Sequence, residues 1–180
     1  MTAERAKQGL IMVFTGSGKG KTTAAMGMAL RAVGHGLKTL MIQFIKGSWH
    51  YGELDAAKRL APQFEIRPMG KGFIRYDRTG PDLEDIRAVK EAWEVFRREM
   101  ASGKYRMIIL DEINYVIHYG LLPVEEVIRS LEARPEGLHL VLTGRNAHPG
   151  IVEIADLVTE MKEIKHPFQA GIKAQRGVEF

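Results

Sequence analysis

A glycine-rich stretch near the start of the chain carries residue types that bind phosphate. It reads TGSGKGKTT over 15–23 and follows the apolar run LIMVF. Glycines let backbone N–H groups approach phosphate oxygens, a lysine after the last glycine reaches a terminal phosphate, and the next hydroxyl can bind Mg²⁺. Lys21 and Thr22 stand in these two positions. The stretch therefore predicts a phosphate-binding loop (P-loop) between a strand and a helix.

The first position of this loop departs from the usual spacing. A P-loop has Gly, four residues and then Gly-Lys-Ser/Thr, and counting back from GKT at 20–22 puts Thr15 where the first glycine is expected. Gly16 and Gly18 can supply the backbone conformations that the loop requires. Lys19 adds a positive charge that either favours a long polyphosphate or lies in solvent. The residues expected to bind nucleotide here are Thr15, Gly16, Ser17, Gly18, Lys19, Gly20, Lys21, Thr22 and Thr23.

Two later segments supply polar residues that would meet the loop at one edge of a sheet. MIILDE ends in Asp111 and Glu112, and LTGR ends in Arg145. Open α/β sheets bind ligands at the carboxyl ends of their parallel strands. With a P-loop upstream, the two carboxylates are the expected second half of a magnesium–nucleotide site, one of them binding the metal directly or through water. Arg145 either pairs with phosphate or ribose, or is a surface arginine.

Composition restricts the class of protein. The 180 residues suffice for one domain, 1–180, and the absence of cysteine excludes disulfides, thiolate metal sites and a cysteine nucleophile. The net charge of +4 comes from basic residues scattered among acidic ones, so we expect a small phosphorylated ligand and no nucleic-acid partner. No segment reaches the ~20 apolar residues of a membrane span, and the N-terminal MTAERAKQG lacks a signal-peptide core. We therefore expect a cytoplasmic protein with no membrane partner.

The hydrophobic pattern predicts the elements that position these residues. Strand-length apolar runs alternate with segments of helical period. The predicted strands are GLIMVFT, KTLMIQF, FEIRPM, YRMIILDE, LHLVLTG and, nearer an edge, ADLVTEMKEIKH. The predicted helices cover 22–33, 53–60, 82–100 and 123–133. The fold class is α/β, a three-layer α/β/α P-loop NTPase-like (RecA-like) domain with a mainly parallel sheet.

Two long loops and the aromatic residues add further expectations. The segments IKGSWHYGE and MGKGFIRYDRTGPD are too long to be simple connectors, so we expect them to border the site. Trp49 in the first loop lines a pocket or is exposed, whereas Trp93 falls at helical spacing with Phe96 and is expected in the core. The six histidines have no metal-ligand pattern.

Taken together, these motifs resemble the P-loop-type ATP:corrinoid adenosyltransferase family, whose members make adenosylcobalamin from cob(I)alamin and ATP. The resemblance rests on FTGSGKGKTTAAMGMALRAVGHG, QFIKG, MGKGF, LDEINYVIHYGLL, LTGRNAHPGIVEIADLVTEM and the terminal HPFQAGIKAQRGVEF, in family order. It implies that the reduced cobalt of the corrinoid attacks the ribose 5′-carbon and that triphosphate leaves whole. The nucleophile then belongs to the corrinoid, so the protein needs no catalytic Ser, Cys or His.

The resemblance also implies roles for individual residues. The catalytic group would comprise Lys21, Thr22, Asp111 and Glu112, with Mg²⁺ held by Thr22 and Glu112, and ATP would also contact Arg145. Corrinoid contacts would come from Trp49, Phe73 and Arg75, although Arg75 stands where some members carry a second aromatic residue. Ser17 replaces the Asn or Asp of many members. The implied partners are a second copy of the chain and an electron-donating reductase.

Two other functions use the same residues. A conventional P-loop kinase or ATPase would transfer or hydrolyse the terminal phosphoryl group. A non-catalytic module would bind ATP and corrinoid without turnover. Lys21 and Glu112 favour the enzymes, because a carrier has less need of metal-assisted stabilisation of a leaving group.

Overall fold

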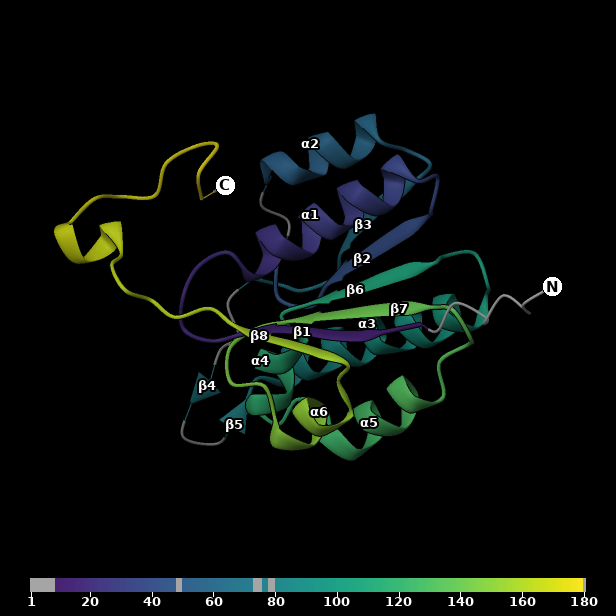
Figure 1. Cartoon of the computed structure of the whole chain (residues 1–180). Helices are drawn as coiled ribbons and strands as arrows, with labels where there is room; N and C mark the ends of the chain where they lie inside the picture. The colour runs from purple at the N-terminus through teal and green to yellow at the C-terminus, as the bar shows by residue number, and fades with distance from the viewer. Residues whose placement is uncertain (1–8, 48–49, 73–75, 78–79, 180) are drawn as a thin grey trace.

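Six strands form one parallel sheet in the order β3-β2-β6-β7-β1-β8, as seen in the computed structural model of the chain (Figure 1). The structure describes residues 9–47, 50–72, 76–77 and 80–179. The strands of the sheet are β1 (Ile11–Thr15), β2 (Thr39–Gln43), β3 (Phe64–Pro68), β6 (Met107–Asp111), β7 (His139–Thr143) and β8 (Leu157–Glu160). A separate antiparallel pair consists of β4 (Tyr76–Asp77) and β5 (Gly80–Pro81).

Helices cover both faces of the sheet. One face carries α1 (Lys21–Gly34) and α2 (Gly52–Arg59), and the other carries α3 (Leu83–Ala101), α4 (Ile113–His118), α5 (Val124–Glu132) and α6 (Pro149–Ile154) (Figure 1). The short 3₁₀ helix η1 (Pro167–Ala170) lies in the segment after β8, away from the sheet. Parallel neighbours require crossover connections, which place helices on the faces of the sheet. The three-layer α/β/α fold predicted from the sequence is confirmed.

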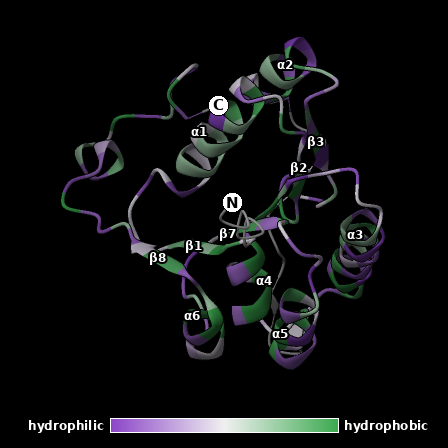
Figure 2. Cartoon of the chain, turned by 45° about the vertical axis from the view of Figure 1, so that its right-hand side comes forward, coloured by the Kyte–Doolittle hydropathy of each residue, from purple (hydrophilic) through white to green (hydrophobic). Residues whose placement is uncertain are grey.

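The central strands β1, β2, β6 and β7 are buried on both faces, which explains their continuous apolar sequences, whereas the edge strands β3 and β8 are more exposed. In β1, Ile11 and Val13 belong to the cluster under α3–α6, whereas Met12 and Phe14 belong to the cluster under α1 and α2. Successive side chains of a strand point to opposite faces, so a strand covered on both sides reads as an apolar run. The central strands accordingly carry mainly hydrophobic residues, while α3 and α5 mix hydrophobic and hydrophilic ones (Figure 2).

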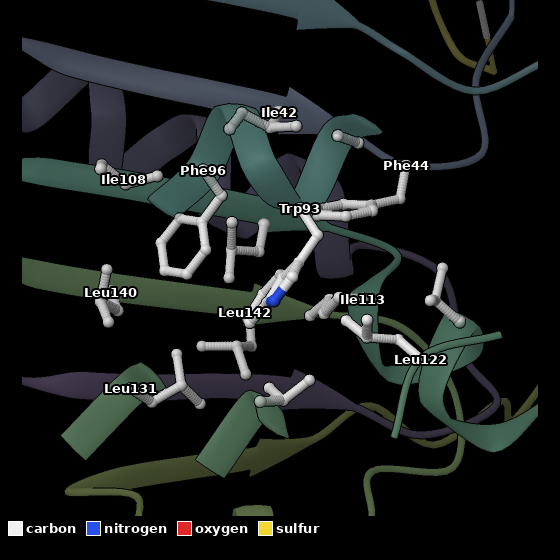
Figure 3. Packing of buried hydrophobic residues seen from close by; sticks show 14 of the residues in the cluster. Ile42, Phe44, Trp93, Phe96, Ile108, Ile113, Leu122, Leu131, Leu140 and Leu142 are labelled. Carbon is white, nitrogen blue, oxygen red and sulfur yellow. The ribbon is translucent and has the colours of Figure 1, made fainter. Parts of the chain in front are cut away.

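Trp93 and Phe96 anchor α3 to the sheet, as the sequence predicted. Both side chains are almost completely buried, and their ring centroids lie 4.7 Å apart (Figure 3). The Trp93 Nε1–H donates to Glu126 Oε1 at 2.8 Å, so the indole is buried with its polar group paired. This packing fixes α3 and α5 on the same face of the sheet.

The predicted helices correspond to α1, α2, α3 and α5, but two further α-helices among the described residues were not predicted. Asp82 caps α3 as expected, because its Oδ1 accepts from the Glu84 N–H at 2.8 Å. Pro123 is the N-cap of α5 rather than part of its first turn. The unpredicted helices are α4 and α6, which have six residues each. Within the described ranges, no helix has the length and apolarity needed to cross a membrane.

Candidate active site

The predicted P-loop connects β1 to α1. Its glycines are needed because of their backbone conformation or because the backbone after β8 lies too close for a side chain. Gly16 and Gly20 have φ angles of 96° and 108°, in the region that favours glycine. A Cβ on Gly16 would stand 2.4 Å from the Met161 carbonyl oxygen, and one on Gly18 would stand 2.9 Å from the same oxygen. The backbone after β8 therefore leaves no room for side chains at these two positions.

Thr15 explains the unusual spacing of the loop. It is the last residue of β1 and pairs in register with Glu160 of β8. Its carbonyl accepts from the Met161 N–H at 2.8 Å, and its Oγ1 accepts from the Ala147 N–H at 3.1 Å. The left-handed turn thus falls on Gly16, one residue later than the usual pattern, so Thr15 needs no glycine conformation. Its hydroxyl joins two backbone segments and does not line the cavity described below.

Gly16→Ala is expected to distort the loop. The added Cβ would meet the Met161 carbonyl oxygen, and alanine disfavours the required φ of 96°. We expect a loss of roughly 1–3 kcal/mol in the free energy of unfolding, measured by denaturant titration, together with weaker ATP binding. Gly34→Ala in α1 is the matched control, because nothing lies within 4 Å of a Cβ there; it should stabilise by up to about 1 kcal/mol. A Gly16→Ala protein as stable as wild type would contradict this account of the close approach.

Lys21 is held inside the loop by backbone carbonyls. Its side chain starts at the first residue of α1, and the residue is 8% exposed. Nζ donates to the Gly16 carbonyl at 2.9 Å and to the Gly18 carbonyl at 2.6 Å. Burial lowers the pKa of Lys21, and the negative charge of Glu112 opposes this shift. The ammonium group is therefore positioned where the loop N–H groups and the α1 N-terminus would bind phosphate.

Asp111 lies at the end of β6, and only one of its two carboxylate oxygens accepts hydrogen bonds from residues that the structure describes. It is completely buried, and Oδ1 accepts from Thr22 Oγ1 and Thr143 Oγ1, each at 2.8 Å. Within the described part of the chain, Oδ2 has no hydrogen-bond partner. Burial raises the pKa of Asp111. A buried carboxylate oxygen without a partner among the described residues, beside a threonine hydroxyl, fits a group that binds a cation.

Glu112 leaves the strand and turns the chain into α4. Its φ of 65° is left-handed, which ends the predicted strand at Asp111, and its N–H donates to Thr143 Oγ1 at 2.9 Å. Burial raises the pKa of Glu112, the Asp111 charge adds to the rise, and the Lys21 charge opposes it. A Cβ on Gly144 would lie 3.2 Å from Glu112 Oε2. The end of β7 therefore shapes the position of this carboxylate.

These residues fit a magnesium ion bound together with phosphate. The oxygen donors present are the Thr22 hydroxyl and the carboxylates of Asp111 and Glu112, which are the ligand types that Mg²⁺ prefers. Among the residues that the structure describes, no group of three or more His, Asp or Glu side chains could hold a metal by itself. Mg²⁺ commonly takes one or two carboxylates and completes its shell with water and phosphate oxygens, so this donor set suits it.

A cavity of about 1040 Å³ opens at this edge of the sheet and is lined by many of the predicted ATP-site residues, although not by Thr15, Gly16 or the buried Asp111. It is lined by 17–23 of the P-loop and by Glu112 and Arg145. Arg145 is exposed, and its charge acts on Lys21 and Glu112. Three residues expected to contact corrinoid, Trp49, Phe73 and Arg75, lie outside the described residues.

The C-terminal segment forms another part of the cavity wall. The Gly18 N–H donates to the Met161 carbonyl at 2.7 Å, and the Glu163 N–H donates to Ser17 Oγ at 3.4 Å. Lys19 pairs with Glu179 at 3.4 Å. From the sequence, Lys19 either binds polyphosphate or lies in solvent. In the structure its side chain is 49% exposed and pairs with a carboxylate.

Several cavity residues had no individual sequence prediction. They are Lys46, Tyr51 and Glu53 from the loop and helix after β2, Tyr115 from α4, and His166. The length of IKGSWHYGE was the available signal for the first three, and this loop was expected to border the site. The Tyr115 and Tyr119 rings lie 4.4 Å apart between centroids, and a hydrogen bond to Tyr119 raises the pKa of Tyr115 to about 12.

Solved structures support the fold. The chain superposes on the flagellar accessory protein FlaH from Methanocaldococcus jannaschii with a TM-score of 0.57 and 11% identity, covering 86% of this chain and 71% of FlaH. It superposes on B204, the DNA-packaging ATPase from Sulfolobus Turreted Icosahedral Virus, with a TM-score of 0.52 and 14% identity, covering 92% and 80%. At these identities the likeness concerns the α/β architecture alone.

Sequence comparison identifies the family. Residues 7–180 match the family model of the ATP:corrinoid adenosyltransferases BtuR/CobO/CobP. The chain is 42% identical to the corrinoid adenosyltransferase of Escherichia coli K12, covering 97% of this chain and 87% of that protein. It is also 42% identical to the corrinoid adenosyltransferase of Pseudomonas aeruginosa, with 98% and 86% covered, and 41% identical to CobA of Salmonella typhimurium, with 97% and 87% covered. The chain therefore belongs to the ATP:corrinoid adenosyltransferase family.

Proposed function

We propose that this protein transfers the 5′-deoxyadenosyl group of ATP to the cobalt of cob(I)alamin and releases intact triphosphate. The electron pair of the reduced cobalt forms the new Co–C bond, the C5′–O bond breaks, and its electron pair leaves with the triphosphate. The observation that carries the proposal is the meeting of Lys21, Thr22 and Glu112 in one cavity of a chain from this family. A leaving triphosphate requires positive charge and N–H donors, and these residues with the surrounding loop supply both.

The chain's own residues would bind and orient the nucleotide. Backbone N–H groups of 16–22 and the α1 N-terminus would bind the triphosphate, with the Lys21 ammonium neutralising charge that develops on it. Arg145 would contact phosphate or ribose from the end of β7. Thr22 and Glu112 would hold Mg²⁺, with Asp111 orienting the Thr22 hydroxyl. When bound, the ion would supply further neutralisation of the triphosphate charge.

The corrinoid would bind beside the two glycine-containing loops. Its proposed contacts are Trp49, Phe73 and Arg75, and described residues of the same two loops, including Ile45, Tyr51 and Gly72, line the cavity. We also propose that 1–180 acts as a single domain in the cytoplasm, that two copies form a homodimer, and that a separate reductase supplies the electrons. The homodimer and the reductase rest on the family resemblance, whereas the single domain and the location rest on the length and composition of the sequence.

The inorganic product of the reaction tests the function. The protein is incubated with ATP, Mg²⁺ and cob(I)alamin, and the products are separated by ion-exchange chromatography. We expect intact triphosphate and adenosylcobalamin in equal amounts, with neither formed when the corrinoid is left out. ADP and phosphate formed without corrinoid would instead favour a kinase or ATPase. Corrinoid binding without product over many enzyme equivalents would favour a non-catalytic module.

A further inference from the structure

The cavity holds a second lysine, Lys46, which belongs to the loop after β2 rather than to the P-loop. Its Nζ forms an ion pair with Glu53 Oε1 and lies 4.5 Å from the centroid of the Tyr51 ring. The Lys46 and Glu53 side chains are 24% and 14% exposed, and both line the same cavity as Lys21. This pair therefore differs from a solvated surface pair: it lies in the wall of the proposed nucleotide site.

The backbone places Lys46 beside the two carboxylates of that site. Gln43 of β2 pairs in register with Asp111, and the Phe44 N–H donates to the Asp111 carbonyl at 3.1 Å. Burial raises the pKa of both Asp111 and Glu112, and the positive charge of Lys46 opposes the rise at each. The Lys46 ammonium thus acts on the same groups as the proposed magnesium ion.

The loop that carries Lys46 is fixed by a second loop. The Gly72 N–H donates to the Ile45 carbonyl at 2.8 Å. A Cβ on Gly70 would stand 2.2 Å from the Ile45 carbonyl group, and one on Gly47 would stand 2.8 Å from the Gly72 nitrogen. The backbone of 45–47 therefore contacts the backbone of 70–72 on both sides of Lys46. Because this contact fixes the backbone, the Lys46 ammonium can leave Glu53 for another partner only by a movement of the side chain.

A polyanion entering this cavity would compete with Glu53 for the ammonium. Lysine binds phosphate as a flexible point charge, and a triphosphate offers more negative charge than one carboxylate. Lys21 is held by loop carbonyls at the α1 N-terminus, so Lys46 brings positive charge from a separate element. Two cations on different elements can contact different phosphates of one chain.

We propose that Lys46 is a second phosphate-binding residue, which exchanges Glu53 for the triphosphate chain when nucleotide binds. In the free protein, Glu53 holds the ammonium in the cavity wall, and on binding it is released from the pair. The P-loop then contacts one part of the phosphate chain and Lys46 contacts another. The inference rests on the proposed function only in taking a triphosphate chain as the bound group.

Calorimetric titration with inorganic triphosphate and pyrophosphate, in Mg²⁺ buffer without corrinoid, tests the exchange. Lys46→Met should weaken triphosphate binding roughly 10- to 100-fold, the cost of one charged hydrogen bond. The P-loop can bind pyrophosphate without Lys46, so Lys46→Met should lower the affinity for pyrophosphate less than about threefold. Lys46→Arg should restore much of the triphosphate affinity. Glu53→Gln should strengthen triphosphate binding, because the competing carboxylate is removed.

The opposite signs of the two changes separate this role from a structural one. If Lys46→Met and Glu53→Gln weaken triphosphate binding alike, the ion pair only supports the loop and the proposal is overturned. The same holds if Lys46→Met leaves triphosphate affinity unchanged. Lys58→Met is the matched control, since Lys58 forms an exposed pair with Asp55 at 3.3 Å outside the cavity lining. The Lys58→Met protein should bind triphosphate with the affinity of the wild type. Should Lys46→Met fail to fold, the comparison of Lys46→Arg with Glu53→Gln decides.

The outcomes also separate this inference from the proposed function. Unchanged triphosphate affinity in a Lys46→Met enzyme that still makes adenosylcobalamin would overturn the inference alone. Loss of triphosphate affinity in a protein whose wild type makes no adenosylcobalamin would overturn the proposed function alone.

Discussion

Lys21→Ala is expected to lower the rate of adenosylcobalamin formation at least about 100-fold, the usual effect of removing a donor that stabilises transition-state charge. The Lys21 ammonium lies between the Gly16 and Gly18 carbonyls, inside the loop that would bind the departing triphosphate. Alanine removes this charge and leaves the N–H groups of the loop in place. Initial rates are measured by the absorbance change of the corrinoid, with ATP and cob(I)alamin saturating.

The control for Lys21→Ala is the same substitution at a lysine outside the cavity. Lys38→Ala removes an exposed lysine immediately before β2, at the opposite edge of the sheet from the cavity, and should keep the wild-type rate. If Lys21→Ala kept the wild-type rate as well, the P-loop would not be binding the leaving group. If Lys21→Ala raised only the KM for ATP, the lysine would bind substrate and transition state equally well.

Asp111→Asn is expected to reduce activity about 100-fold or more and yet to raise the melting temperature of the metal-free protein. Asparagine keeps one oxygen that can accept from Thr22 and Thr143, and it removes the charge that would serve the magnesium ion. Removing a buried charge whose burial is only partly compensated should stabilise the fold by roughly 1 kcal/mol, or about 2–4 °C for a chain of this size. Scanning calorimetry in EDTA measures the shift.

The sign of this stability change follows from the raised pKa of Asp111. Burial raises that pKa, so the folded protein binds the proton more tightly than the unfolded chain does. Protonation therefore favours folding, and the metal-free wild type should lose stability as the pH rises through the folded-state pKa. Asp111→Asn should lack that loss. With Mg²⁺ and ATP the order should reverse, because only the wild type gains the binding energy of the ion. A lower melting temperature for Asp111→Asn in EDTA would contradict this account.

The strands and the catalytic edge were predictable because their causes are local. The runs IMVF and MIIL are apolar because each strand is buried on both faces, and Asp82 caps α3 through its own side chain. Parallel strands end at a common edge, so a P-loop after β1 and Asp111 at the end of β6 had to lie near each other. These inferences needed no knowledge of long-range contacts.

The rest depends on contacts between distant residues or on unusual backbone conformations. Glu112, the N-cap of α4, has a left-handed conformation, and no glycine or proline before the helix indicates where it begins. The displaced turn at Gly16 depends on Met161, and the Lys19 pair depends on Glu179. The sequence did contain a signal for the start of α6, because His148 is its N-cap and Pro149 lies in its first turn. The Lys46–Glu53 pair lies within a few residues, but nothing in the sequence placed it in the cavity.

The position of β1 has a consequence for biosynthesis. β1 pairs with β7 through 140–143 and with β8 through 157–160, so β1 is translated well before both of its neighbours. A nascent chain therefore carries GSGKGKTT without the Met161 backbone that shapes it until that segment has left the ribosome. Since domains can fold only when their partner segments are available, the phosphate cradle is completed only after Met161 has been translated, and ATP has no finished site on shorter nascent chains.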